Sequence, residues 1–521
     1  MPNRSPLHTT AARSSLVVLA PLIAALAVCG CGGGGGGGGG GGSTTPTVGA
    51  TSVPLPSSAS LAQQCASPRA GSSDKQGSLD TEKAFVHSWI DETYLWYQDV
   101  RGLPASTLDA ANYSTSVDYF SALKTSLITA SGKPKDPFHF TYDTPTWIAL
   151  SQSGVSYGYG FQIALVSAIP PRSAVVAFTD PNTPASTQNI ARGATVLTVD
   201  GVDMANGSDV DTLNAGLFPT RAGVHTLVIQ DQGATASRTV TLTAASIVRT
   251  PVQNAHALPA PNAGVGYLLF NDHIATAESE LVDAIGVLEA ANVTDLVLDL
   301  RYNGGGYLDI ASELAYMIAG PTNTAGKFFE RETFNDRNPF NTTTADDTVD
   351  FHTTAQGFSL AQGTALPTLG LNRVFVLTSA STCSASEAIV NGLRGAGVVV
   401  HLIGGTTCGK PYGFYPQENC NTTYFAIQFQ GVNNVGFGNY ADGFSPTCTV
   451  ADDFTHALGD PAESQLQVAL GFRGTGTCVA PAGLAKRGIQ RTDALGRTPA
   501  APVLPRDAFR ENRFLRSRGQ V

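Results

Sequence analysis

The stretch VFVLTSASTCSASEAI, residues 374–389, decides how the chain is interpreted. Its first four residues are apolar and typical of a buried strand, and the small residues after them lead into a helical pattern from about Ser386. Such a turn exposes a hydroxyl at a helix N-terminus, where backbone N–H groups and the helix dipole stabilise developing negative charge. Ser384 is therefore a candidate nucleophile. Ser384 and Glu387 also form the S-x-x-E pattern of a capping box, which any helix start can use.

Two further segments follow apolar strands in the same way. GGTTCGK at residues 404–410 places Lys410 on the loop after the strand at 398–403, although a solvated surface lysine is the ordinary alternative. DLRYNGGG at residues 299–306 ends in three glycines, whose amides can closely approach a ligand. No Lys-Ser or Lys-Thr pair follows these glycines, so a nucleotide-binding P-loop is poorly supported. Strand and helix alternate through this region, which predicts an α/β core with a mixed, partly parallel sheet at 250–475.

Two smaller regions precede this core. Between residues 78 and 150, Phe85 and Trp89 begin an apolar pattern with helical spacing, which predicts a small N-terminal helical domain. Between 154 and 247 the pattern changes to strand-like alternation, as at Phe161, Ile163 and Leu165. We therefore expect a multidomain α/β protein with a β-rich domain between the helical domain and the core.

The amino terminus predicts export. Arg4 and Arg13 precede an apolar run at 16–28, which is short for a bilayer span and typical of a signal peptide. The run ends near Gly30-Cys31, which resembles a bacterial lipobox, so residues 1–31 are interpreted as a signal peptide with Cys31 as the lipidated residue. An ordinary signal peptide with chance cysteines is the alternative. Residues 32–60, rich in glycine and then in Ser, Thr and Pro, predict a flexible tether that holds the globular part away from a membrane. The expected location is the bacterial cell envelope, lipid-anchored at the periplasmic face or the outer membrane.

The net charge and the cysteine content limit the kinds of partner and cofactor that can be expected. The formal net charge of −10 argues against nucleic acid as a partner. Of eight cysteines, six remain after Cys29 and Cys31 are set aside, and an even number in an oxidising compartment favours disulfides. Cys420 with Cys448 is the first expected pair. No Cys/His cluster has zinc spacing, so neither a metal nor a cofactor is expected. The basic tail at 480–521 is expected to be disordered, with contact to anionic lipid as the alternative.

Taken together, the three motifs resemble the C-terminal processing (tail-specific) serine protease family, in its lipoprotein branch with a PDZ-like domain. The resemblance implies a ClpP/crotonase-like core and a PDZ-like domain at 154–247. In such domains a glycine-containing loop, here Tyr159-Gly160-Phe161, captures the C-terminal carboxylate of a peptide that adds as a strand.

The resemblance also implies the roles of the site residues. Ser384 falls on the family's nucleophile and Lys410 on its base, while Gly305 or Gly306 and the amide of Ala385 fall on its oxyanion hole. The implied activity is that of an endopeptidase that cleaves protein or peptide substrates near C-termini or in unfolded segments through an acyl-enzyme. A lysine base must be neutral, so its pKa must fall from about 10.4 toward about 7–8 by burial. Tyr412, Phe414 and Tyr415 are expected to supply dry surroundings.

Some features depart from this pattern. Ser384 and Lys410 are 26 residues apart (410 − 384), about one more than the family spacing. Another branch of the superfamily uses a Ser–His arrangement, and Asp136-Pro137-Phe138-His139 resembles the element that carries its histidine, so His139 is the alternative base. The alternative function is that of a catalytically silent envelope lipoprotein of the same fold that binds peptides or other ligands.

Overall fold

The computed structural model describes residues 55–167, 170–339, 347–479 and 513–514. The predicted signal peptide, Cys31 and most of the tether lie outside these residues, as does almost all of the basic tail. Within the described ranges, no helix has the length and apolar character needed to cross a bilayer.

The first described region is helical. It is built from α1 (Ser58–Leu61), α2 (Leu79–Thr93), α3 (Tyr97–Arg101), α4 (Ala105–Leu108), α5 (Ser116–Ala122) and α6 (Thr144–Ser153), with β1 (Gln64–Cys65), β2 (Lys75–Gln76), η1 (Ala110–Asn112) and β3 (Phe140–Asp143) between them. Helix α2 starts at a capping box in which Ser78 and Thr81 exchange side chain-to-backbone hydrogen bonds. Its buried face includes Trp89, whose ring stacks on Phe120 of α5.

A β-rich region follows and has an apolar core of its own. Its seven-stranded sheet has the order β4-β10-β9-β7-β6-β5, and β8 pairs with β7. The strands are β4 (Val155–Gly158), β5 (Phe161–Ser167), β6 (Ser173–Thr179), β7 (Thr195–Val199), β8 (Val202–Asp203), β9 (Gly223–Gln230) and β10 (Arg238–Val248), with helices α7 (Pro184–Thr187) and α8 (Val210–Leu217). The residues Ile163, Leu213 and Leu227 belong to one buried cluster that joins this sheet to α8.

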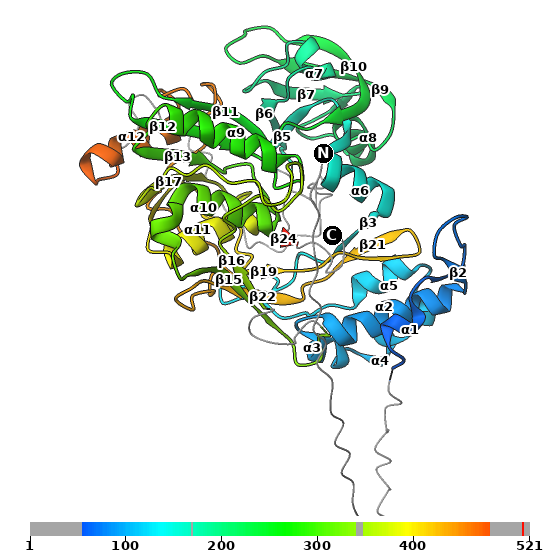
Figure 1. The fold of residues 1–521 in the computed structure, drawn as a ribbon. Coiled ribbons are helices and arrows are strands. Elements are labelled where there is room, and N and C mark those ends of the chain that lie inside the picture. Colours follow the sequence, from blue (N-terminus) through cyan, green and yellow to red (C-terminus); the bar gives the residue numbers. More distant parts are fainter. Residues whose placement is uncertain (1–54, 168–169, 340–346, 480–512, 515–521) are drawn as a thin grey trace, which may run out of the picture. The chain divides into compact units, whose positions relative to one another are not determined.

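The centre of the remaining chain is a six-stranded mixed sheet with the order β11-β12-β13-β17-β18-β23 (Figure 1). Its strands are β11 (Val252–Ala257), β12 (Val265–Phe270), β13 (Asp295–Asp299), β17 (Arg373–Thr378), β18 (Val399–Gly404) and β23 (Cys448–Thr449). β11 runs antiparallel to β12, whereas β12, β13, β17, β18 and β23 are parallel. Because the carboxyl ends of parallel strands share one edge, the loops after β13, β17 and β18 lie close together. These are the loops that carry the three sequence motifs.

Helices cover both faces of this sheet, which explains why its strands are almost continuously apolar. They are α9 (Ala277–Ala290), α10 (Leu308–Thr324), α11 (Ala385–Gly395) and α12 (Ser464–Thr475). Alternate strand residues such as Leu298 and Val376 belong to one cluster with α9, α10 and α11. Their neighbours Val297 and Phe375 belong to a second cluster with α12. The prediction of a multidomain α/β fold with a mixed sheet is confirmed.

Smaller sheets surround the core. One has the order β16-β15-β22-β19, a second has β20-β21-β3, and β14 pairs in parallel with β24. These strands are β14 (Gly306–Tyr307), β15 (Phe328–Phe334), β16 (Thr348–Asp350), β19 (Tyr412–Gly413), β20 (Gln417–Asn419), β21 (Thr422–Phe425), β22 (Phe429–Val432) and β24 (Arg513–Phe514). Strand β3 of the helical region therefore completes a sheet with the hairpin that follows Lys410.

Three disulfides join the six remaining cysteines, namely Cys65–Cys420, Cys383–Cys408 and Cys448–Cys478. The prediction that these cysteines form disulfides is confirmed, but the expected Cys420–Cys448 pair is wrong. Cys420 lies in the turn between β20 and β21, where it meets the segment before α2, whereas Cys448 lies in the core sheet.

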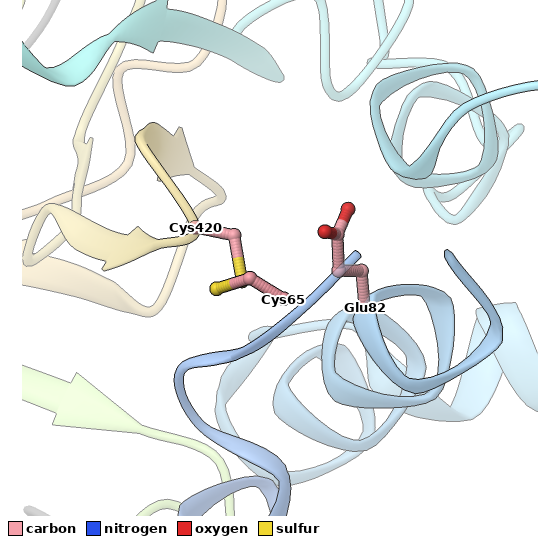
Figure 2. A group of neighbouring side chains, drawn as sticks. All are labelled: Cys65, Glu82 and Cys420. Carbon is pink, nitrogen blue, oxygen red and sulfur yellow. A yellow bond between two sulfur atoms is a disulfide. The ribbon is translucent and has the colours of Figure 1, made fainter. Parts of the chain in front are cut away.

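Figure 2 shows Cys65 and Cys420 joined beside Glu82, which projects from α2. The carboxylate of Glu82 accepts the backbone N–H of Ala66 at 2.8 Å. Because the two sulfur atoms are bonded to each other, this group presents no thiolate to a metal ion.

Candidate active site

Ser384 lies at the turn from β17 into α11. Its φ of 60° and ψ of −114° place a residue other than glycine at a positive φ, a strained conformation that costs on the order of 1–3 kcal/mol. The turn is held by Thr382, whose hydroxyl accepts the N–H of Ser379 at 2.9 Å and donates to the carbonyl of Leu300 at 2.9 Å. The side chain of Ser384 is fully buried. The helix begins one residue after Ser384, close to the predicted start.

Glu387 connects the nucleophile loop to the lysine loop. Its Oε2 accepts the N–H of Ser384 at 3.0 Å and the N–H of Lys410 at 2.8 Å. Its Oε1 accepts the hydroxyl of Thr407 at 2.5 Å and the N–H of Gly409 at 2.9 Å. Burial raises the pKa of Glu387, and these four donors act in the opposite direction. The carboxylate expected as a helix cap thus also fixes the backbone of Lys410.

Lys410 is fully buried between aromatic rings. Its Nζ lies 4.3 Å from the ring centroid of Phe414 and 4.6 Å from that of Phe138. Of the three aromatic residues expected around it, Phe414 is in contact with the amine, whereas the ring of Tyr412 packs edge-on against Trp96 at 4.9 Å. Phe138 was not expected in this role, because it comes from the helical region more than 250 residues earlier.

The glycine turn after β13 adopts backbone angles that only glycine accepts readily. Gly305 has a φ of 108° and Gly306 a φ of 136°. A Cβ on Gly306 would lie 2.4 Å from the carbonyl oxygen of His273, so no other residue fits there. The N–H of Gly305 donates to Oδ1 of Asn303 at 2.9 Å. That amide is therefore occupied, and Gly306 belongs to β14, where it pairs with Arg513 of β24.

Asn303 also connects this turn to the nucleophile loop through hydrogen bonds. Its backbone carbonyl accepts the N–H of Cys383 at 3.1 Å and the hydroxyl of Ser386 at 3.0 Å. Its side-chain amide donates to the carbonyl of Phe270 at 3.0 Å, at the end of β12. The glycine turn, the nucleophile loop and the lysine loop are therefore joined by buried hydrogen bonds, and Ala385 lies between Ser384 and Ser386, which both take part in them.

His139 makes its recorded contacts within the helical region. Its Nε2 is 3.0 Å from the carbonyl oxygen of Phe120, its Nδ1 is 3.4 Å from Asp136, and its ring stacks on Phe120 with centroids 3.8 Å apart. Asp136 in turn accepts the hydroxyl of Tyr94 at 2.7 Å. These contacts describe a packed histidine, and Phe138 beside it is the residue that reaches Lys410.

The loop at Tyr159-Gly160-Phe161 is tied to the start of α7. The N–H of Ala185 donates to the carbonyl of Tyr159 at 2.9 Å, and a Cβ on Gly160 would lie 2.3 Å from Thr183. The side chain of Tyr159 is buried and donates its hydroxyl to the carbonyl of Gly216 at 2.9 Å. Its ring therefore packs within the β-rich region.

Sequence reasoning missed a buried ion network beneath the glycine turn. Arg301 is fully buried and contacts Asp299 at 2.9 Å, Glu463 at 2.7 Å and Asp452 at 2.9 Å. Burial acts to raise the pKa of Asp452, but Arg301 and Arg192 outweigh it and lower that pKa. The signal that could have revealed it is Arg301 itself, a charged residue two positions after the buried strand β13.

Arg192 joins the β-rich region to this network. Its guanidinium contacts Asp452 at 2.6 Å, donates to the hydroxyl of Tyr302 at 2.5 Å and lies 4.8 Å from the ring centroid of Phe454. Tyr302 directly precedes Asn303. The β-rich region therefore contacts the core at Tyr302, next to the residue that connects the glycine turn to the nucleophile loop.

Comparison with known proteins shows which protein family the core resembles. Residues 264–425 match the family model described as Peptidase family S41. A carboxyl-terminal-processing protease from Picosynechococcus sp. is 25% identical over 264 residues, which are 50% of this chain and 56% of that protein. The chain thus spans little more than half the length of this curated relative. The predicted resemblance to C-terminal processing proteases is confirmed, and the similarity to peptidase family S41 covers residues 264–425.

One solved structure supports the same fold, and a second is reported for comparison. An S41 protease structure from Bacteroides fragilis matches with a TM-score of 0.57 and 22% identity, over 75% of this chain and 97% of its own. A photosystem II D1 C-terminal processing protease matches with a TM-score of 0.42 and 18% identity, over 72% of this chain and 94% of its own.

Proposed function

We propose that the chain is a serine endopeptidase in which Ser384 is the nucleophile and Lys410 the base. The observation that supports this proposal best is the double role of Glu387, whose Oε2 binds the backbone N–H groups of both residues. A buried carboxylate shared in this way fixes the position of one loop relative to the other. These bonds are to backbone N–H groups and position both residues whatever their side chains are; the second supporting observation is that the side chains of Ser384 and Lys410 are both buried at these loops.

The surroundings suit general-base chemistry. A lysine accepts a proton only in its neutral form. Lys410 is fully buried, but its Nζ lies over the rings of Phe138 and Phe414, which attract a cation, so the proposal requires that the cost of desolvation outweigh these two contacts. The neutral amine would take the hydroxyl proton of Ser384 as its oxygen attacks the scissile carbonyl, which gives an acyl-enzyme. The amine would then return the proton to the leaving nitrogen, and water would hydrolyse the ester. The predicted oxyanion donors for this step are the amide of Gly305 or Gly306 and that of Ala385.

The proposed substrates are proteins or peptides cut near their C-termini or in unfolded segments. Extended chain can reach a site between loops, and a PDZ-like domain at residues 154–247 would add a backbone site at Tyr159-Gly160-Phe161 for a C-terminal carboxylate. Because Ser384 and Lys410 are both fully buried, covering segments must move before a substrate reaches them. The predicted envelope location through lipidated Cys31 belongs to this proposal.

The test is cleavage of an unfolded protein by the full-length chain, compared with Ser384→Ala and Lys410→Ala. Each variant should lose on the order of 10⁴-fold or more in kcat, because nucleophile and base act as a unit. Ser88→Ala and Lys83→Ala are matched controls, since they remove a buried serine and a buried lysine from α2 and should retain kcat.

The same experiment separates the alternatives. If Lys410→Ala retains activity while His139→Ala loses it, His139 is the base. If the folded wild-type chain binds peptides but never cleaves them, the silent binding protein is the correct description.

A further inference from the structure

One disulfide joins the two loops that carry the proposed nucleophile and base. Cys383 directly precedes Ser384, and Cys408 lies two residues before Lys410. The disulfide Cys65–Cys420 joins the helical region to a hairpin, and Cys448–Cys478 joins β23 to the segment after α12. Only Cys383–Cys408, among these three, links the motifs on which catalysis is proposed to depend.

The same sulfur atoms lie against the carboxylate that positions these loops. Sγ of Cys408 is 3.3 Å from Oε2 of Glu387, the oxygen that accepts the N–H groups of Ser384 and Lys410. In a disulfide this sulfur carries no proton, so it donates nothing to the carboxylate. The oxygen therefore serves the two backbone donors as long as the disulfide is intact.

The two residues of this disulfide differ in burial. Cys383 is fully buried, whereas Cys408 is partly exposed. Thiol–disulfide exchange requires a thiolate to reach a sulfur in line with the bond that breaks. An external thiol would therefore attack Cys408 with Cys383 as the leaving group.

We propose, building on the proposed function, that Cys383–Cys408 is a positioning element for Ser384 and Lys410 and makes turnover sensitive to dithiols. In the reductive step a dithiol's thiolate bonds to Sγ of Cys408, and the electron pair of the broken S–S bond leaves on Cys383, which takes a proton. The second thiol of the reductant then bonds to the first sulfur and releases Cys408 as a thiol. The dithiol becomes a cyclic disulfide, and the protein gains two electrons and two protons.

Reduction disturbs the site in two ways. The covalent limit on the separation of the two loops disappears. The new S–H of Cys408 also becomes a third donor at Oε2 of Glu387 and competes with the N–H groups of Ser384 and Lys410. Both changes displace the base relative to the nucleophile without touching the β-rich region, so kcat falls while KM is unchanged.

The chain offers a matched control for this test. Cys448–Cys478 spans 30 residues and Cys383–Cys408 spans 25, so the two bonds constrain the unfolded chain to a similar degree. In the full-length protein, Cys383→Ala/Cys408→Ala should lower kcat about 10- to 100-fold. Cys448→Ala/Cys478→Ala should lower thermal stability by a comparable amount and leave the kcat of the folded protein unchanged. Dithiothreitol should lower kcat in wild type and in the control variant, but not the residual kcat of Cys383→Ala/Cys408→Ala.

Amide hydrogen exchange measures the same positioning without depending on proteolysis. Peptides that contain the N–H groups of Ser384 and Lys410 should exchange faster in Cys383→Ala/Cys408→Ala, and peptides from β9 and β10 should not. The proposal is overturned if exchange at both loops is unchanged, or if kcat falls equally in the two double variants. If wild type shows no cleavage but exchange changes as expected, the positioning role stands and the proposed peptidase activity fails.

Discussion

Replacing Glu387 with glutamine tests the central feature of the site with a change of very few atoms. Each carboxylate oxygen of Glu387 accepts two hydrogen bonds, from Thr407 and Gly409 on one side and from Ser384 and Lys410 on the other. A glutamine has one acceptor oxygen and one NH₂ group. In either orientation of the amide, two buried donors lose their acceptor and face another donor.

The cost can be worked out from these contacts. A buried donor left unsatisfied costs about 1–3 kcal/mol, so two of them cost about 2–6 kcal/mol. Burial of the Glu387 carboxylate is unfavourable and raises its pKa. Removing this charge therefore offsets part of the loss. We expect Glu387→Gln to lower the free energy of unfolding by about 2–4 kcal/mol. We expect kcat to fall about 100-fold, because displacing catalytic groups by about 1 Å has that effect.

The assay combines urea unfolding with kcat and KM on a protein substrate, and Glu313→Gln is its control. Burial and the neighbouring Glu278 raise the pKa of Glu313 to about 9, so its carboxyl is neutral at pH 7. An amide replaces the neutral acid and needs no proton uptake on folding, so Glu313→Gln should not lower the free energy of unfolding at pH 7. If Glu387→Gln keeps kcat within about threefold of wild type, Glu387 does not position the site.

Three further outcomes follow from the structure. Because folding raises the pKa of Glu313 from 4.5 to about 9, its stabilising contribution is complete below about pH 4.5 and is lost as the pH rises toward 9. Between pH 7 and 9, wild type should lose up to about 3 kcal/mol relative to Glu313→Gln in urea unfolding, and parallel pH profiles would contradict this. Arg192→Ala should cost about 3–5 kcal/mol by leaving Asp452 undercompensated, and a thermal-unfolding loss below about 1 kcal/mol would refute that. Gly306→Ala should lower kcat at least about 100-fold, because its Cβ would lie 2.4 Å from the His273 carbonyl oxygen, and unchanged kinetics would exclude this turn from the site.

Local sequence predicted the elements that carry the chemistry. The apolar run before Ser384 became β17, the small residues after it became the turn, and Lys410 followed β18. These predictions succeeded because strand periodicity and glycine placement are short-range signals. Parallel strands then bring their carboxyl ends to one edge, so three loops far apart in sequence could be expected to meet.

Contacts between distant segments could not be predicted in this way. Phe138 lies against Lys410, and Cys65 pairs with Cys420, because β3 of the helical region joins the hairpin that contains β21. Arg192 meets Asp452 because the β-rich region packs on the core. Each contact depends on how separately folded segments associate, and neither local propensity nor residue spacing encodes that association.

The Cys65–Cys420 disulfide, which spans 355 residues, turns most of the chain into a covalent ring. Both Ser384 and Lys410 lie within that ring. A single backbone cut anywhere between the two cysteines opens the ring and gives two polypeptides that stay joined by the disulfide. A peptidase that occasionally nicks one of its own surface loops would thus keep its nucleophile and base in one covalent unit, and the damage would be visible on a gel only after reduction.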